Sequence, residues 1–171
     1  MKNGNGFIDD EYFKGEIKNG EINGKVKEYD YGKLIFEGEY LNGKRNGKGK
    51  EYNDENGKLI FEGEYLNGKR NGKGKEYKGG ELILDGEYFN GELNGKVKEY
   101  EGGELIFDGE YFNGEIIKGK LYDSLRSGEL LFDGEYFNGL YWNGRGRKYN
   151  NYGQFIYEGE FLYGETINGR Y

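Results

Sequence analysis

The chain has 171 residues and a formal net charge of −7, and it contains 34 glycines but no proline, cysteine or histidine. The absence of cysteine excludes disulfides, thiolate metal sites and thiol nucleophiles. The negative net charge opposes general electrostatic binding to nucleic acid or anionic lipid. No stretch approaches the roughly 20 apolar residues that a membrane helix needs, and with 34% hydrophobic but 18% aromatic residues a thin aromatic core is expected.

The first segment, residues 4–12, resembles the shortened second half of a unit that recurs in the rest of the chain. Because the terminal units of repeat arrays are normally atypical, we predict that residues 1–12 are a partial repeat or an N-terminal cap. The opening residues do not resemble a signal peptide. We expect a cytoplasmic protein, alternatively one associated with the cytoskeleton or a membrane.

From residue 13 onward the phrase aromatic-acid-Gly-Glu-aromatic recurs. Clear copies span 36–40, 61–65, 107–111, 132–136 and 157–161, a variant spans 84–88, and a weaker copy spans 13–17. The anchor glycines are separated by 23 or 25 residues and are Gly15, Gly38, Gly63, Gly86, Gly109, Gly134 and Gly159. The sequence therefore predicts seven repeats over residues 13–171, of which the last is truncated.

Each repeat has the pattern of a β-hairpin. Residues 34–41 are rich in β formers, residues 42–47 supply turn chemistry, and residues 48–52 form a second strand. A further turn, such as Asn56-Gly57, joins each hairpin to the next. Since no segment shows the apolar spacing of a helix, the predicted fold class is an all-β antiparallel meander of tandem hairpins, with no substantial helix.

The register of each hairpin depends on the length of its loop. A four-residue loop over 43–46 places Tyr40 opposite Gly49 and Glu39 opposite Lys50. In that register an aromatic ring covers a cross-strand glycine, and the Glu–Lys pair contributes about 0.2–1 kcal/mol. The same count pairs Tyr65 with Gly74 and, with a loop longer by one residue, Tyr136 with Gly146.

These phrases resemble the MORN (membrane occupation and recognition nexus) repeat family. The resemblance is carried by residues 61–65, by Asn67-Gly68-Lys69 and by Gly72-Lys73-Gly74, and it covers about residues 13–171. This chain has Tyr where many members carry Trp, and it has Asn46 and Asn71 where the family often has His. The resemblance implies an elongated, single-layer, twisted sheet with a groove, used in scaffolding, membrane apposition or partner capture.

Few residues are suited to catalysis. Besides tyrosine, the hydroxyl groups are those of Ser124, Ser127 and Thr166, and none has a base at a suggestive spacing. One glutamate recurs in every clear repeat, which favours ladder salt bridges over a catalytic pair; this column is Glu39, Glu64, Glu87, Glu110, Glu135 and Glu160. The acidic clusters 9–11 and 53–56 fit solvated turns better than an EF-hand. We therefore predict no enzyme activity, no catalytic residues, no metal site and no cofactor.

An aromatic column supplies the candidate partner-binding residues: Tyr40, Tyr65, Tyr88, Tyr111, Tyr136 and Phe161. Self-packing along the array and partner binding are compatible interpretations of it. Strand alternation sends a second apolar set, Leu41, Leu66, Phe89, Phe112, Phe137 and Leu162, to the opposite face. A sheet that is apolar on both faces is poorly suited to isolation in water. Unless bulges redirect a row, we expect one face to be covered by a peptide, another domain or a second copy in a homodimer.

Two local features qualify this picture. In the fifth repeat residues 116–121 lack the usual Asn-Gly and residues 124–127 form an unusual connection, which indicates either drift in a loop or a recognition feature. The basic hairpin tips carry Lys44, Arg45, Lys69 and Arg70, which could bind anionic lipid headgroups or form ladder pairs.

The leading hypothesis is a non-enzymatic scaffold that binds a protein segment along an aromatic groove and does not bind nucleic acid. The alternatives are a lipid-binding tether and an accessory module of an enzyme whose catalytic domain lies outside this chain.

Overall fold

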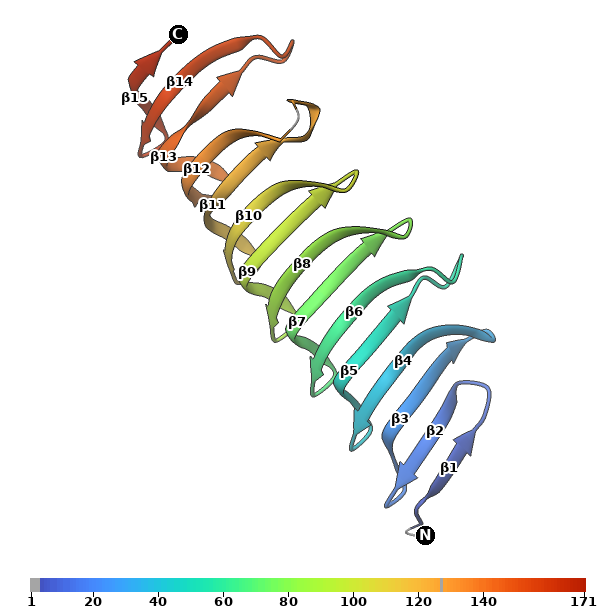
Figure 1. Ribbon diagram of the computed structural model, residues 1–171. Coiled ribbons are helices and arrows are strands. Elements are labelled where there is room, and N and C mark those ends of the chain that lie inside the picture. Colours follow the sequence, from blue (N-terminus) through green and yellow to red (C-terminus); the bar gives the residue numbers. More distant parts are fainter. Residues whose placement is uncertain (1–3, 127) are drawn as a thin grey trace. The chain divides into compact units, whose positions relative to one another are not determined.

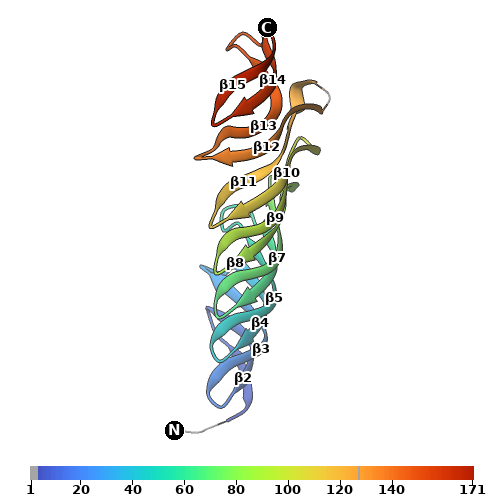
Figure 2. The same ribbon diagram turned by 90° about the vertical axis from the view of Figure 1, so that its left-hand side faces the viewer.

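The computed structural model describes residues 4–126 and 128–171. The chain divides into two compact units, Met1–Glu92 and Leu93–Tyr171. Within each unit, every strand pairs antiparallel with the next strand of the chain, and the strands lie side by side in one layer (Figures 1 and 2). The predicted all-β antiparallel meander is confirmed.

The first unit holds eight strands: β1 (Gly6–Asp9), β2 (Phe13–Lys18), β3 (Glu21–Asp30), β4 (Lys33–Leu41), β5 (Lys44–Tyr52), β6 (Leu59–Leu66), β7 (Lys69–Lys78) and β8 (Glu81–Phe89). Strand β1 pairs with β2, which begins at Phe13. Strand β1 lies within the predicted partial repeat 1–12, of which residues 1–3 fall outside the described residues.

The second unit is built from β9 (Glu92–Glu101), which starts at the boundary, and from β10 (Glu104–Phe112), β11 (Glu115–Asp123), β12 (Glu129–Phe137), β13 (Leu140–Tyr149), β14 (Phe155–Leu162) and β15 (Glu165–Arg170). Among the described residues the only helical segment is η1 (Ser124–Arg126), a single turn between β11 and β12. All seven anchor glycines lie in the first strand of a hairpin.

Most hairpin tips are two-residue Asn-Gly turns, and Tyr163-Gly164 takes this place in the last repeat. Asn42 and Gly43 both have positive φ, 49° and 73°, as a type I′ turn requires. Several tips are also tied to the preceding hairpin: the Gly68 N–H donates to the Arg45 carbonyl at 2.8 Å, and the Gly91 N–H donates to the Arg70 carbonyl at 2.9 Å. These bonds hold neighbouring tips against one another.

The predicted register was wrong. Next to the turn Tyr40 pairs with Arg45, and further along the strand Gly38 pairs with Gly49. A β-bulge between these pairs absorbs two extra residues of β5, at a point where Gly47 has a φ of 95°. The type I′ turn matches the twist of the strands better than a four-residue loop does, so the extra length moves into the bulge. In the sixth repeat Tyr136 likewise pairs with Tyr141 and not with Gly146.

The core lies on one face of the sheet, over pairs of glycines. Phe36 is fully buried, and its ring lies over Gly38 and Gly49: a Cβ on Gly38 would come within 2.7 Å of that ring and of the Gly49 backbone. The equivalent rings Phe61, Phe107 and Phe132 are also buried. We call this the aromatic face; Glu37, Glu39, Lys48, Lys50 and their counterparts point to the opposite, charged face.

Candidate functional site

The predicted partner-binding column lies in the interior of the aromatic face. Tyr40, Tyr65, Tyr88 and Phe161 are only 8%, 4%, 5% and 3% exposed, and Tyr111 and Tyr136 are half-buried. The rings pack edge to face, so that Phe36 lies 6.0 Å from Tyr40 in its own repeat and 5.4 Å from Tyr65 in the next. This geometry favours self-packing as the role of the column.

In the first unit the hydroxyl groups of the column are also occupied. Tyr65 Oη donates to Glu51 at 2.6 Å and Tyr88 Oη donates to Glu76 at 2.9 Å, while Tyr40 donates in the same way to Glu28. Burial, and then the hydrogen bond to Glu51, raises the pKa of Tyr65 far above its ordinary value of 10. The tyrosines are therefore neutral donors, each of which anchors a glutamate from the preceding hairpin.

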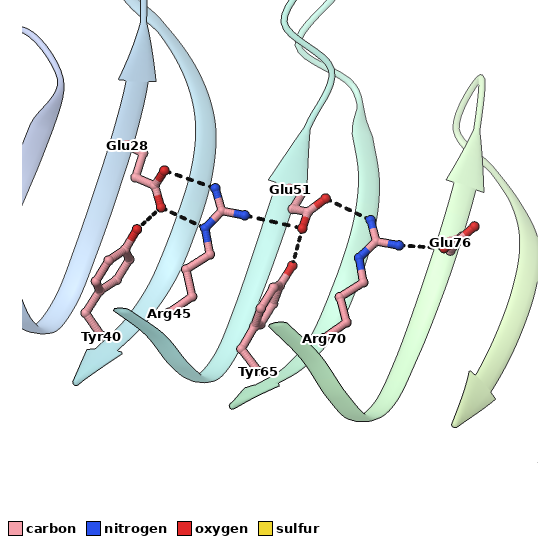
Figure 3. A network of polar contacts seen from close by, with 7 residues as sticks. All are labelled: Glu28, Tyr40, Arg45, Glu51, Tyr65, Arg70 and Glu76. Atoms are coloured by element: carbon pink, nitrogen blue, oxygen red, sulfur yellow. Dashed lines mark hydrogen bonds and ion pairs between the residues drawn. The ribbon is translucent and has the colours of Figure 1, made fainter. Parts of the chain in front are cut away.

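Two arginines complete a chain of ion pairs across the aromatic face (Figure 3). Arg45 contacts Glu28 at 2.8 Å and Glu51 at 3.4 Å, and Arg70 contacts Glu51 at 2.8 Å and Glu76 at 2.6 Å. Glu28 and Glu51 thus each bind a tyrosine and an arginine of the following hairpin. This alternation of charge connects β3, β5 and β7.

The lipid-binding candidates fall into two classes. Arg45 and Arg70 stack on Phe36 and Phe61, with their guanidinium carbons 4.0 and 3.8 Å from the ring centroids, and only about a quarter of each side chain is exposed. Lys44 and Lys69 are exposed and pair with Leu41 and Leu66 at the hairpin tips. The lysines alone are therefore accessible to a headgroup.

The second apolar row is not redirected by the bulges. In the first unit Leu41 and Leu66 are 50% exposed and Phe89 is 64% exposed. In the second unit the row also stays exposed, at 58% for Phe112, 54% for Phe137 and 43% for Leu162. Cover by a partner or a second copy remains a prediction for this row.

The charged face of the first unit contains a channel of about 860 Å³. Its floor is a row of residues that pair with one another across successive strands, including Gly38, Gly49, Gly63 and Gly74. These residues place no side chain on this face. Its walls are formed by charged side chains on both sides of that row, seven lysines and five carboxylates: Lys14, Lys25, Lys27, Lys48, Lys50, Lys73 and Lys75, with Glu37, Glu39, Glu62, Glu64 and Asp85. The channel crosses the strands and is open to solvent.

The sequence analysis missed this channel. The repeated motifs Lys48-Gly49-Lys50 and Glu62-Gly63-Glu64 carry the signal, since like charges two residues apart lie on one face of a strand while the residue between them points to the other face. The correct register is needed to align these motifs, and it places Gly49 opposite Gly63 and Gly63 opposite Gly74.

Beside the channel walls, a second set of tyrosines braces the carboxylates. Tyr52 Oη donates to Glu37 and Tyr77 Oη donates to Glu62, both at 2.6 Å. Burial, followed by these hydrogen bonds, raises the pKa of each tyrosine to about 12. The carboxylates of that wall are therefore held in place by neutral phenols.

The irregular fifth connection is held by its neighbours. Ser124 Oγ donates to Glu101 at 2.9 Å, and Arg126 stacks on Tyr149 with its guanidinium carbon 3.8 Å from the ring centroid and donates to the Gly153 carbonyl at 2.6 Å. These contacts give residues 124–126, which depart from the repeat pattern, a structural role. Ser127 lies outside the described residues.

The acidic clusters of the sequence form turns. Asp10 Oδ1 accepts backbone hydrogen bonds from Tyr12 and Phe13, and Asn53 Oδ1 accepts them from Glu55 and Asn56. Within residues 4–126 and 128–171, no group of three or more acidic side chains is placed to hold a metal ion, and no helix is long and apolar enough to cross a membrane.

No protein-family model matches this chain, and neither does any curated protein sequence. The MORN resemblance therefore stays an interpretation of the repeated motif.

Proposed function

We propose that this chain is a non-enzymatic scaffold that binds a segment of a partner protein in the channel on the charged face of its first unit. The observation that carries the proposal is the channel itself: a floor of sheet backbone between two charged walls. The aromatic column remains essential in this proposal, but as the core that sets the position of the walls.

The form of the channel suits a chain segment better than a small substrate. It crosses successive strands of the unit, and it offers repeated contacts instead of one enclosed pocket with a few convergent polar groups. The ion pairs in its walls are also long and exposed to solvent. Lys50 and Glu62 are 3.9 Å apart, and their side chains are 47% and 36% exposed. Exposed pairs of this kind are worth roughly 0–1 kcal/mol and can exchange partners at little cost.

An unbiased displayed-peptide library selected on the whole chain tests the proposal. Enriched peptides should bind the double variant Lys50→Glu with Lys75→Glu about tenfold more weakly than the wild-type chain, because both residues line the channel. The matched control, Lys33→Glu with Lys78→Glu, changes the net charge equally at exposed positions outside the channel. Failure to enrich any peptide, or equal weakening by both variants, would contradict the proposal.

A second candidate function, a membrane tether, is favoured by one observation. Exposed Leu41 and Leu66 pair directly with exposed Lys44 and Lys69, which puts apolar and cationic groups together as interfacial binding requires. Co-sedimentation with phosphatidylserine vesicles should then be lost in Leu41→Ser with Leu66→Ser. It should persist with Lys50→Glu and Lys75→Glu, and sedimentation that never exceeds that with neutral vesicles would rule the tether out.

A further inference from the structure

The charges of the channel are sorted by strand. Strands β3, β5 and β7 each place two lysines on the charged face, one on either side of the floor, whereas β4 and β6 each place two carboxylates there. The lysine pairs are Lys25 and Lys27, Lys48 and Lys50, and Lys73 and Lys75. Positive and negative bands therefore alternate along the channel.

The two walls differ in how well their lysines are neutralised. In one wall Lys27, Lys50 and Lys75 lie 3.7, 3.9 and 3.8 Å from Glu37, Glu62 and Asp85. In the other wall Lys25, Lys48 and Lys73 are exposed, and none of them has an ion-pair partner within 4 Å in the described part of the chain.

Two of the carboxylates that face these lysines from the neighbouring strand, Glu39 opposite Lys25 and Glu64 opposite Lys48, are directed elsewhere. They fold against the bulge glycines Gly47 and Gly72, so closely that a Cβ on either glycine would collide with the carboxylate. Lys25, Lys48 and Lys73 thus form a row of exposed cationic groups along the channel, in a protein whose net charge is −7.

The spacing of this lysine row matches an extended polypeptide. Adjacent strands lie roughly 4.8 Å apart, so Lys25, Lys48 and Lys73, on every second strand, repeat at about 9.6 Å. A chain in the polyproline II conformation rises about 3.1 Å per residue and has three residues per turn, so three residues cover about 9.3 Å and every third side chain points to the same side. A side chain at every third position of such a segment therefore meets the next lysine in register.

We propose that the occupant of the channel is a protein segment in the polyproline II conformation with an acidic residue at every third position, whose carboxylates bind Lys25, Lys48 and Lys73. This inference rests on the proposed function and adds the chemistry of the partner. The residues of the floor point to the aromatic face, so the segment can lie against the sheet backbone, between walls that are about 7 Å apart. A single-stranded nucleic acid fits less well, because Phe7 is the only aromatic residue that lines the channel and bases need stacking platforms.

Fluorescence anisotropy with synthetic peptides tests the inference on the full chain. One peptide of about 10 residues carries Glu at every third position among Ser and Gly, and a second has the same composition with its Glu residues clustered at one end. We expect the spaced peptide to bind about tenfold more tightly than the clustered one, and to lose about tenfold in affinity in the triple variant Lys25→Gln, Lys48→Gln and Lys73→Gln.

The matched control is the triple variant Lys33→Gln, Lys44→Gln and Lys78→Gln, which removes three exposed lysines outside the channel. It should change the affinity less than about twofold, and circular dichroism should show both triple variants folded. Equal binding of the two peptides, equal losses in the two variants, or tighter binding of single-stranded polyuridylate would each overturn the inference. If the displayed-peptide selection yields channel binders without spaced acids, the inference fails while the proposed function stands.

Discussion

The guanidinium of Arg70 lies over the ring of Phe61, 3.8 Å from its centroid, while its nitrogens bind Glu76 of its own strand and Glu51 of the preceding hairpin. One side chain thus covers the core of its own repeat and connects it to the preceding one. The arrangement stabilises the stacking of repeats through contacts that a single repeat cannot make.

Arg70→Ala should therefore lower the free energy of unfolding by about 1–3 kcal/mol, through lost charged hydrogen bonds and lost cover for Phe61. Arg70→Lys should recover only part of this loss, because an ammonium group cannot bridge two carboxylates in one plane. Urea unfolding followed by far-ultraviolet circular dichroism measures both changes. Lys69→Ala, at the adjacent exposed position, should change the free energy by less than about 0.5 kcal/mol.

Two glycines are required for different reasons. A Cβ on Gly49 would lie 2.6 Å from a carbon of the Phe36 ring and 3.1 Å from the Tyr65 ring, so Gly49→Ala should cost about 1–3 kcal/mol by overpacking. A Cβ on Gly43 meets nothing within 4 Å, but its φ of 73° makes Gly43→Ala cost roughly 1–2 kcal/mol of backbone strain.

Replacement by Asn separates the two cases, since Asn tolerates positive φ but is larger than Ala. Thermal melts should show Gly43→Asn close to the wild-type chain and Gly49→Asn worse than Gly49→Ala. The same rank order at both positions would disprove this division of roles.

The stability of the first unit should depend on pH through Glu51. Burial of this carboxyl by itself raises its pKa, but hydrogen bonds from Arg70 and Tyr65, together with the charges of Arg70 and Arg45, outweigh burial and hold the pKa below its ordinary 4.5. A depressed pKa contributes stability that is present above the unfolded value and is lost as the pH falls through the folded value.

We therefore expect the free energy of unfolding to fall below about pH 4.5, and Glu51→Gln to flatten that fall while lowering stability at pH 7. Glu55→Gln, in an exposed turn, is the control and should leave the curve unchanged. Unfolding curves from pH 3 to pH 8 measure the effect, and parallel curves for the wild-type chain and Glu51→Gln would refute it.

Two tyrosines of the aromatic column differ in one hydrogen bond. Tyr65 Oη donates to Glu51 at 2.6 Å, whereas Tyr136 Oη is buried and has no hydrogen-bond partner among the described residues. Tyr65→Phe should therefore lower the free energy of unfolding by about 1.5–3 kcal/mol, because it removes a hydrogen bond to a charged group. Tyr136→Phe should be neutral or stabilising, since it removes a desolvated hydroxyl that gains nothing in return. Differential scanning calorimetry of the two variants gives the comparison.

The sequence by itself determined the tandem hairpins and their order. Asn-Gly pairs such as Asn42-Gly43 and the alternation of apolar and charged residues in 34–41 act over a few residues, so their meaning is independent of the rest of the chain. The repetition of one pattern seven times then leaves a meander as the simplest way to pair the strands, and β1 to β8 and β9 to β15 each follow it.

Only the tertiary structure decided the register, the exposure of the aromatic column and the position of the channel. The register depends on where two extra residues of β5 are placed, and the bulge at Gly47 settles this through the preferred twist of the turn. Tyr65 is buried because Phe36 and Arg45 from the preceding hairpin lie against it, contacts that its own repeat does not contain. The channel likewise exists only when the charged residues of successive strands align in two rows, because a groove between charged walls is a property of neighbouring strands and not of any one of them.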